Sequence, residues 1–319
     1  MAEGFYLSRF DTTLPPEGSA GLRILDITDP SSPCEVGFYS TEMPAYTVFV
    51  TDTLAYLGEY DNGFIILNVS DPTTPIEIGS CRIYGFLVDV FLSGDYAYAA
   101  GWVNRVYIID VSDPTHPAVI ASYDSSGYYL DVYVSGSYAY VAGGVGSSVY
   151  GGIHILDVSD PRHPELVYSR TLESYLSSSV SVSDSLVYFA CGTEGFLILN
   201  ISDPTEPIEE SFYDTGDFAN DVVVSGSYAY IANFFDGLTV LDISEPEAPT
   251  IVGSYDIGGG VAGNRAVDVF ILEPYAYVAD EDFLILDISA PDAPRFVSRY
   301  FTSNIAWGVF VSRLSLIHI

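Results

Sequence analysis

Four aspartates recur at the same position of an internal repeat, and they are the residues of the chain best placed for chemistry. They are Asp89, Asp131, Asp221 and Asp268, and each is followed by a run of apolar residues. Carboxylate oxygens that converge on one point are the ligands that calcium prefers. Alternatively, each carboxylate accepts a hydrogen bond from the backbone of the next repeat and so fixes the order of the repeats. Because a repeated residue more often has a repeated structural role, we expect the second arrangement and keep a calcium site as the alternative.

Aromatic side chains form a second candidate site, because they occur in the connecting segments more often than loops require. The same segments carry acidic and amide side chains. Flat rings that stack on a ligand, beside polar groups that orient it, are typical of sugar or peptide recognition. We therefore expect a protein or carbohydrate partner at this rim, with the alternative that the rings only cover the ends of the core. The candidate ligand-binding residues are Trp102, Tyr128, Tyr129, Phe218, Phe234, Phe235 and Asp236.

Catalytic chemistry has little support in the sequence. Of the four histidines, two lie in proline-bounded turns, and His154 lies in an apolar segment where a hydrogen-bonded core role is expected. No Ser/His/Asp or Cys/His grouping recurs along the chain. A hydrolase or lyase built from paired carboxylates, such as Asp236 and Glu281, is the alternative from another functional class. We expect a protein that is not an enzyme and has no cofactor beyond the calcium alternative.

The charge of the chain excludes several classes of partner. It has 10 basic and 43 acidic residues, which gives a formal net charge of −33. Such a surface repels the phosphates of nucleic acids and anionic lipid headgroups. No run of about 18 apolar residues is present, so we expect no insertion into a membrane. An acidic surface of this kind suits a soluble exported protein.

A short anchor with the consensus D-[VI]-S-D-P-x-x-P divides the chain into repeats. Its seven copies are spaced by 42 to 47 residues. A period in the forties that contains several short strands is typical of propeller arrays, whose units bury their faces against their neighbours. The copies begin at Asp26, Asn68, Asp110, Asp157, Asn200, Asp242 and Asp287.

The repeat over residues 130–168 contains four strand patterns. An apolar run precedes the turn at Gly136, where glycine supplies the backbone freedom of a tight hairpin. The next strand, YAYVA, alternates large and small side chains, so its rings lie on one face. A third strand, apolar on both faces, must end at Pro161, and a more polar strand follows. Four antiparallel strands per repeat predict a β-propeller whose first strands, with the four aspartates, line a central channel.

The two ends of the chain complement each other. Residues 5–7 match a second strand and are followed by a third and a fourth strand, whereas residues 307–312 match a first strand. We therefore predict an all-β, seven-bladed β-propeller of four-stranded antiparallel blades, closed by the C-terminal inner strand, as a single domain over residues 1–319. Residues 313–319 depart from the repeat and are expected to be a non-native tail. The natural protein is then expected to continue beyond residue 312 and to begin before Met1.

The strand and anchor elements resemble those of the LVIVD-repeat proteins. Segments such as GLRILDITDP, GFIILNVSDP and GLTVLDISEP carry this resemblance, which extends over about residues 5–312. It implies a β-propeller on secreted or surface-attached proteins, and it brings no catalytic residues. Together with the rim residues, it leads us to expect a monomeric, non-catalytic binding module outside the cell or on its surface. The alternative is a purely structural spacer of a larger surface protein.

Overall fold

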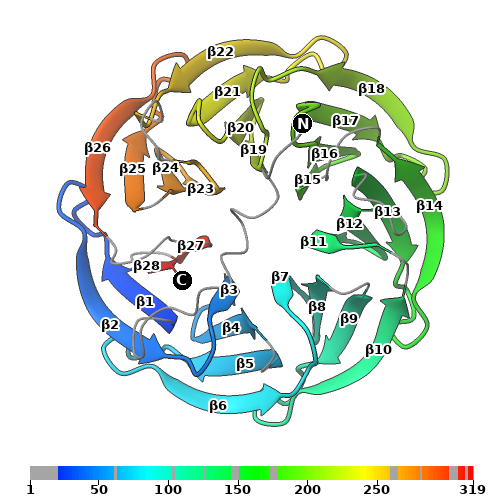
Figure 1. Ribbon diagram of the computed structural model, residues 1–319, viewed down its shortest axis with the longest axis vertical. Helices are drawn as coiled ribbons and strands as arrows, with labels where there is room; N and C mark the ends of the chain where they lie inside the picture. Colours follow the sequence, from blue (N-terminus) through cyan, green and yellow to red (C-terminus); the bar gives the residue numbers. More distant parts are fainter. Residues whose placement is uncertain are drawn as a thin grey trace, which may run out of the picture.

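The computed structural model describes residues 21–60, 63–102, 105–124, 127–144, 151–172, 178–258, 265–280, 282–301, 308–312 and 315–318. These residues form 28 β-strands, which pair into seven four-stranded antiparallel sheets. The sheets are arranged radially, so that one edge of each lies near a central axis and the other belongs to the outer wall (Figure 1). The chain is therefore an all-β propeller with four-stranded antiparallel blades, as the repeat predicts.

Six of the sheets each consist of four consecutive strands, ordered from the axis outward. The second sheet contains β3 (Ala45–Val50), β4 (Leu54–Glu59), β5 (Gly63–Asn68) and β6 (Ile76–Cys81), and the third contains β7 (Leu87–Ser93), β8 (Tyr96–Gly101), β9 (Arg105–Asp110) and β10 (Ala118–Asp124). The fourth contains β11 (Tyr129–Ser135), β12 (Tyr138–Gly144), β13 (Gly151–Asp157) and β14 (Glu165–Thr171), and the fifth contains β15 (Ser179–Ser183), β16 (Leu186–Ala190), β17 (Phe196–Asn200) and β18 (Ile208–Tyr213). The sixth contains β19 (Asp221–Ser225), β20 (Tyr228–Ala232), β21 (Leu238–Asp242) and β22 (Thr250–Tyr255), and the seventh contains β23 (Asp268–Leu272), β24 (Tyr275–Ala279), β25 (Phe283–Asp287) and β26 (Arg295–Tyr300).

The first sheet combines both ends of the described chain. From the outer wall inward its order is β2 (Cys34–Ser40), β1 (Gly21–Asp26), β28 (Ser315–His318) and β27 (Val309–Ser312). The strand predicted over 307–312 is thus present as the innermost strand, β27. The prediction for the second strand is wrong: β28 takes this position, and residues 5–7 lie outside the described residues. β28 pairs with both β27 and β1, and a hairpin with β27 closes a much shorter loop than a distant N-terminal segment.

The core is divided among the junctions between sheets. In β8, Tyr98 is 3% exposed and the flanking alanines are fully buried, as the Y-A-Y pattern predicts. Among the described residues, clusters of buried apolar side chains join each sheet to its neighbours. The first sheet takes part on both sides: Leu22 packs with the second sheet, whereas Leu25 and Val309 pack with the seventh. Each sheet is therefore stabilised mainly by what it buries against the next one.

Aspartate side chains close the turns that end the third strands. Asp110 Oδ1 accepts hydrogen bonds from Ser112 N (3.1 Å) and Ser112 Oγ (2.6 Å). The backbone bond of this kind occurs in all seven repeats, with asparagine as the acceptor in two of them. Asparagine can replace aspartate here because its amide oxygen is also an acceptor. The anchor therefore ends the third strand through local turns, as the sequence predicts.

In several sheets a small residue in the outer strand lets the next sheet approach closely. In every sheet the pairing of the third and outer strands shifts register at the same point of the repeat, where one outer-strand residue has no partner. We call the outer-strand residue that follows this unpaired residue the junction position. At the junction position Gly79, an added Cβ would lie 2.2 Å from the carbonyl oxygen of Pro114 in the anchor turn of the next sheet. At the junction position Ser298, the hydroxyl donates a hydrogen bond to the carbonyl oxygen of Pro30 in the first sheet (2.5 Å). The anchor turn of one sheet thus packs on the outer strand of the sheet before it.

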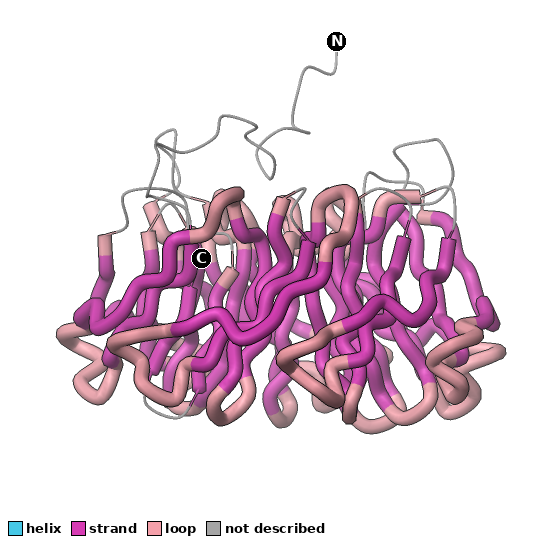
Figure 2. Tube along the Cα trace, turned by 90° about the horizontal axis from the view of Figure 1, so that it is seen from below, coloured by secondary structure: helices cyan, strands magenta, loops and turns pink. Residues whose placement is uncertain are grey.

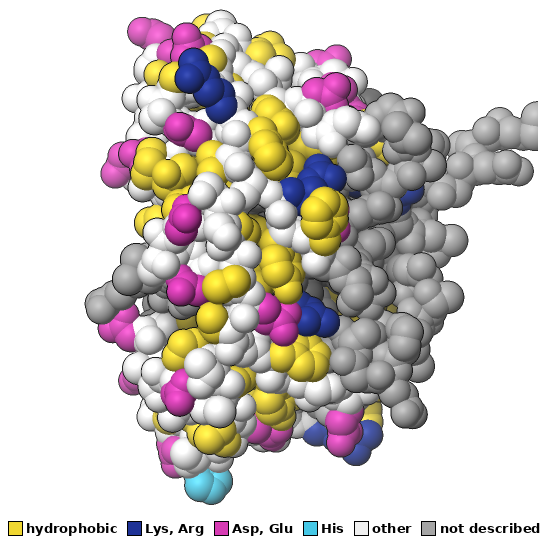
Figure 3. Space-filling model, turned by 90° about the vertical axis from the view of Figure 1, so that its left-hand side faces the viewer, with side chains coloured by type: hydrophobic (Ala, Val, Ile, Leu, Met, Phe, Trp, Pro, Cys, Tyr) yellow, Lys and Arg dark blue, Asp and Glu magenta, His cyan; other side chains and the backbone are white. Residues whose placement is uncertain are grey.

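The two faces of the propeller carry different connections. The short hairpin turns and the anchor turns lie on one face, and the links from the second to the third strand and between sheets lie on the other, called the rim face below (Figure 2). On the outer wall, apolar side chains are interspersed with carboxylates (Figure 3); Ile76 is 61% and Phe296 51% exposed. Within the described residues, no helix has the length and hydropathy needed to cross a bilayer.

Candidate functional site

The four aspartates predicted to line the channel lie on inner strands around a central cavity of about 340 Å³. Each carboxylate accepts a hydrogen bond from a backbone N–H of the next inner strand. The donors are Val132 N for Asp89 (3.1 Å), Val180 N for Asp131 (2.8 Å), Val269 N for Asp221 (2.8 Å) and Val309 N for Asp268 (2.7 Å). These bonds connect neighbouring sheets in the order of the repeats, as the structural hypothesis requires.

Asp89 and Asp131 lie on adjacent inner strands, and their carboxyl groups are close enough to affect each other's pKa. Burial raises the pKa of both groups, and the charge of Asp89 raises the pKa of Asp131 further. Hydrogen bonds from Val132 N and the Thr47 hydroxyl to Asp89 oppose the effect of burial on the pKa of Asp89. Of the two carboxyl groups, Asp131 has the pKa raised further above its usual range, so it keeps its proton to the higher pH.

Replacing Asp131 with asparagine is expected to make the propeller more stable at neutral pH. Folding raises the pKa of this carboxyl group above its value in the unfolded chain, about 3.9. Its contribution to the stability of the folded state is fully present below that unfolded pKa and is lost as the pH rises through the folded pKa. An amide at position 131 stays neutral, can donate to Asp89 and can accept from Val180 N. The melting temperature of Asp131→Asn should exceed that of the parent at pH 8, by a margin that shrinks toward pH 4. A margin that does not depend on pH, or one equal to that of the exposed control Asp95→Asn, contradicts this assignment.

The calcium alternative finds no grouping of ligands in the described part of the chain. There, no three His, Cys, Asp or Glu side chains lie together in an arrangement that could hold a metal ion. The N–H groups directed at the inner-strand carboxylates also occupy acceptor positions that a cation would need. The observed hydrogen bonds of the four aspartates lie at the junctions between sheets.

Trp102 and Tyr128 come together on the rim face, at the junction of the third and fourth sheets. Trp102 follows β8 and Tyr128 precedes β11, and their ring centroids lie 4.8 Å apart with the planes tilted by 34°. Both side chains are half-buried. The rings therefore cover the end of a sheet junction and keep part of their surface accessible.

Tyr129 lies in the core, so its predicted place at the rim is wrong. It is 1% exposed, and its hydroxyl lies 3.1 Å from His154 Nδ1. Tyr129 was assigned to a connecting segment, but it is the first residue of β11, next to a register shift in the pairing of β11 with β12. Burial lowers the pKa of His154 to about 4, so this imidazole is neutral at physiological pH, which agrees with the expected core role.

Phe218, Phe234 and Phe235 form a second group, here called the Phe234 cluster together with Arg265. The Phe234 ring centroid lies 5.9 Å from that of Phe218 and 4.7 Å from that of Phe235. Arg265 Cζ lies 5.3 Å from the centroid of Phe234 and 5.9 Å from that of Phe235. All four side chains are half-buried, and the guanidinium over the rings is a cation–π arrangement.

Acidic side chains flank the Phe234 cluster. Asp217 Oδ2 accepts a hydrogen bond from Phe235 N (2.8 Å). The exposed Asp236 lies close enough to two further carboxylates that partial burial and then the charges of Asp217 and Asp256 raise its pKa. Glu281, the other half of the carboxylate pair considered from the sequence, lies outside the described residues. The structure thus brings the predicted rim residues together as two groups on different sheets.

Sequence reasoning missed Arg265. It lies in a glycine-rich segment, residues 258–266, that lengthens the link between two sheets and reads as a simple loop extension. Within the described residues its Nε is buried and has no hydrogen-bond partner. The sequence feature that could have identified Arg265 as a site residue is its position as a single arginine in a glycine-rich link. Such a link has no structural need for a long cationic side chain.

Known proteins support the fold and the repeat assignment. The LVIVD repeat model matches residues 17–41, 45–83, 85–125, 126–171, 176–215, 216–257 and 263–302. Similar solved structures include a protein from Bacteroides uniformis described as a candidate 6-phosphogluconolactonase (TM-score 0.66, 13% identity, 84% of this chain and 92% of that one). They also include the computationally designed Ika8 protein (TM-score 0.64, 8% identity, 86% of this chain and 79% of that one). At such low identity they share the fold alone. No curated protein matches this sequence. The seven matches extend over most of the chain, which therefore belongs to the LVIVD-repeat family.

Proposed function

We propose that this chain binds a protein or carbohydrate partner, without catalysis, through the Phe234 cluster on its rim face. The backbone of Phe234 carries this proposal. Its φ of 39° lies in a region that residues other than glycine rarely adopt. Such a conformation costs on the order of 1–3 kcal/mol, and conformations of this kind concentrate at ligand-binding sites.

The chemistry of the cluster matches such a partner. Rings that keep part of their surface accessible can stack on the apolar face of a sugar or on a peptide side chain. The Arg265 guanidinium offers donors, and the exposed Asp236 offers acceptors. This combination of rings, donors and acceptors supports polar, directional recognition of a ligand surface.

We further propose that the seven sheets close into a seven-bladed ring. The pairing of β1 with β28 and the hydrogen bond from Ser298 to Pro30 support closure. The excess of acidic residues and the family resemblance support a secreted or surface-attached location, and a monomer is the proposed state. A purely structural spacer is the competing function.

Separate alanine substitutions in the two aromatic groups test the binding proposal. The parent protein is first screened on a glycan array and on an immobilised peptide library. Phe235→Ala is expected to weaken capture of the best ligand by about tenfold or more, because loss of a stacked ring costs about 1.4 kcal/mol or more. Trp102→Ala, in the other group, should leave capture unchanged, and both variants should melt close to the parent. If the Phe235→Ala variant still captures the ligand as the parent does, or if the parent captures no ligand, the structural-spacer function is favoured.

A second candidate function is a carboxylate-based hydrolase or lyase that uses Asp236. Its raised pKa favours this candidate, because a general acid must hold a proton near its working pH. Turnover on a panel of glycosides that disappears in Asp236→Asn would support it. A folded parent protein that turns over none of the panel would exclude it for those substrates.

A further inference from the structure

The central cavity carries a layer of aromatic side chains next to the layer of aspartates. Two residues after the aspartate position of the repeat, side chains on the same face of each inner strand form this second layer. In five of the seven sheets the residue there is aromatic, and all five line the cavity of about 340 Å³. We call these residues the aromatic collar: Phe270, Phe310, Phe49, Phe91 and Tyr133, from the seventh, first, second, third and fourth sheets.

Neighbouring rings of the collar are in contact. The centroid of Phe49 lies 5.4 Å from that of Phe91 and 5.2 Å from that of Phe310. Phe91 and Tyr133 are 4.5 Å apart, and Phe270 and Phe310 are 4.9 Å apart. The ring planes within these pairs differ by 40–66°, a range that includes the turn of about 51° from one to the next of seven radial sheets. The collar thus repeats one ring orientation around the axis.

The fifth and sixth sheets leave the collar open on one side. At the same position of the repeat they have the small residues Ser181 and Val223, which also line the cavity. Seven side chains at the observed ring spacing surround a centre about 6 Å from each of them, which is the reach of a cation–π interaction. A group at the centre of the cavity is therefore within reach of several rings at once.

The rings of the collar keep accessible surface and are already held in place. All five side chains are half-buried. On its buried side, Phe49 packs on the core between the second and third sheets, and Phe91 on that between the third and fourth. Rings ordered by this packing lose little further freedom when a ligand binds. The cavity volume also lies within the roughly 300–1,000 Å³ of small-molecule sites.

The charge around the central cavity favours a cation. The four inner-strand aspartates belong to its lining, and the chain as a whole has a formal net charge of −33. Among the described residues, the lining contains no arginine or histidine. Acidic groups on the walls of a narrow cavity concentrate their field inside it. The ring faces and the carboxylates thus attract the same kind of occupant.

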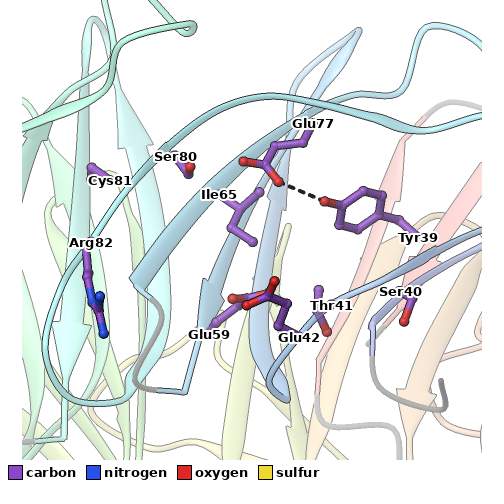
Figure 4. A pocket seen from close by; sticks show the side chains of 10 residues that line it. All are labelled: Tyr39, Ser40, Thr41, Glu42, Glu59, Ile65, Glu77, Ser80, Cys81 and Arg82. Atoms are coloured by element: carbon purple, nitrogen blue, oxygen red, sulfur yellow. Dashed lines mark hydrogen bonds between the residues drawn. The ribbon is translucent and has the colours of Figure 1, made fainter. Parts of the chain in front are cut away.

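A smaller pocket between the first and second sheets has acidic groups without such a collar. Its volume is about 260 Å³, and Glu42, Glu59 and Glu77 contribute to its wall (Figure 4). Tyr39 is the aromatic residue of this lining, and its hydroxyl donates a hydrogen bond to Glu77 Oε2 (2.8 Å). Of these two cavities, the central one combines carboxylates with several accessible rings.

We propose that the central cavity binds the quaternary ammonium group of a small organic cation, which the aromatic collar surrounds. The aspartates keep their backbone hydrogen bonds and act on the cation through their charge. Ring faces accept no ordinary hydrogen bonds, so an ammonium with N–H groups would lose its bonds to water without replacing them. A quaternary ammonium has no such donors, and ring faces attract it. This inference does not rest on the proposed function, because no residue of the Phe234 cluster lines the cavity.

Binding of choline, with its uncharged isostere 3,3-dimethylbutan-1-ol as the control ligand, tests this inference. Each ligand has one set of equivalent methyl protons, so saturation-transfer NMR titrations of the whole chain at 0.15 M NaCl follow both by the same signal. Choline should bind about tenfold or more tightly than the alcohol, because several rings and the acidic field act on its charge.

Two leucine variants locate the choline site. Phe49→Leu keeps an apolar side chain but removes the middle ring of the collar, so it should weaken choline binding by about threefold or more. The alcohol should bind this variant as it binds the parent. Phe212→Leu removes an exposed ring from the outer strand β18 and should leave choline binding unchanged. Val223→Lys places an ammonium group on the open side of the collar and should abolish choline binding.

Several outcomes overturn the inference. Absence of choline binding to the parent chain, or equal binding of choline and the alcohol, rejects a cation site. Equal effects of Phe49→Leu and Phe212→Leu on choline binding assign the signal to non-specific association with the acidic surface. If Phe49→Leu does not fold, Val223→Lys decides, because a folded Val223→Lys variant that binds choline as the parent does places the site outside the cavity. If neither variant folds, the comparison of choline with the alcohol on the parent chain decides.

Discussion

Replacing Gly79 with valine is expected to destabilise the propeller by about 3 kcal/mol, at the upper end of what an overpacked site usually costs. A Cβ at this junction position would lie 2.2 Å from the carbonyl oxygen of Pro114. The obstacle is backbone, which cannot rotate away as a side chain can, so the third sheet must move outward and lose contact with the second. Thermal unfolding followed by circular dichroism measures the effect.

A matched glycine separates this clash from the loss of a glycine as such. Gly94 lies in a hairpin turn at φ 60°, and an added Cβ there meets nothing within 4 Å. Gly94→Asn should therefore change stability by less than about 1 kcal/mol, since asparagine tolerates this conformation. Gly253→Val should behave like Gly79→Val, because its Cβ would lie 2.2 Å from Pro291 O. If Gly79→Val melts with the parent, the close packing of the anchor turn is not a requirement of the fold.

Replacing Asp221 with alanine is expected to cost about 2–4 kcal/mol. Asp221 is 8% exposed and accepts hydrogen bonds from Ser179 Oγ and from Val269 N (2.8 Å), which lie on the inner strands on either side. Removing the carboxylate leaves two donors without their acceptor, and each costs about 1–3 kcal/mol when it stays buried. Chemical denaturation measures the free energy of unfolding directly.

Two further variants test the explanation for Asp221. Asp221→Asn keeps one acceptor oxygen, so it should lose part of this stability and melt between the parent and the alanine variant. Asp95→Ala removes an exposed aspartate from a hairpin turn and should change stability by less than about 0.5 kcal/mol. An Asp221→Ala variant as stable as Asp95→Ala would show that the inner-strand bonds do not hold the sheets together.

The repeat made the architecture predictable, because each strand has a signature that short-range physics explains. The Y-A-Y strand separates rings from small side chains, and Asp110 closes the turn that ends β9. The same alignment singled out Asp89 and Asp131, because a repeated residue points to a repeated contact. The residues that donate hydrogen bonds to these aspartates could not be predicted, because each donor is a backbone N–H, which almost every residue type has.

The sites were less predictable than the fold. Tyr129 was misplaced because it was assigned to a loop, whereas it is the first residue of β11 and its side chain is buried in the core. The position of β28 followed from hairpin geometry at the chain end, where the repeat pattern stops.

The inner-strand aspartates also bear on how such a chain can evolve. Each one reaches a main-chain N–H of the next repeat, a group that every residue except proline provides. A repeat can therefore be duplicated, deleted or exchanged without a compensating substitution in its new neighbour. An ion pair between repeats would instead require a matching charged side chain in the neighbouring repeat. Gene duplication can thus change the number of copies while each junction that carries such an aspartate keeps its central hydrogen bond.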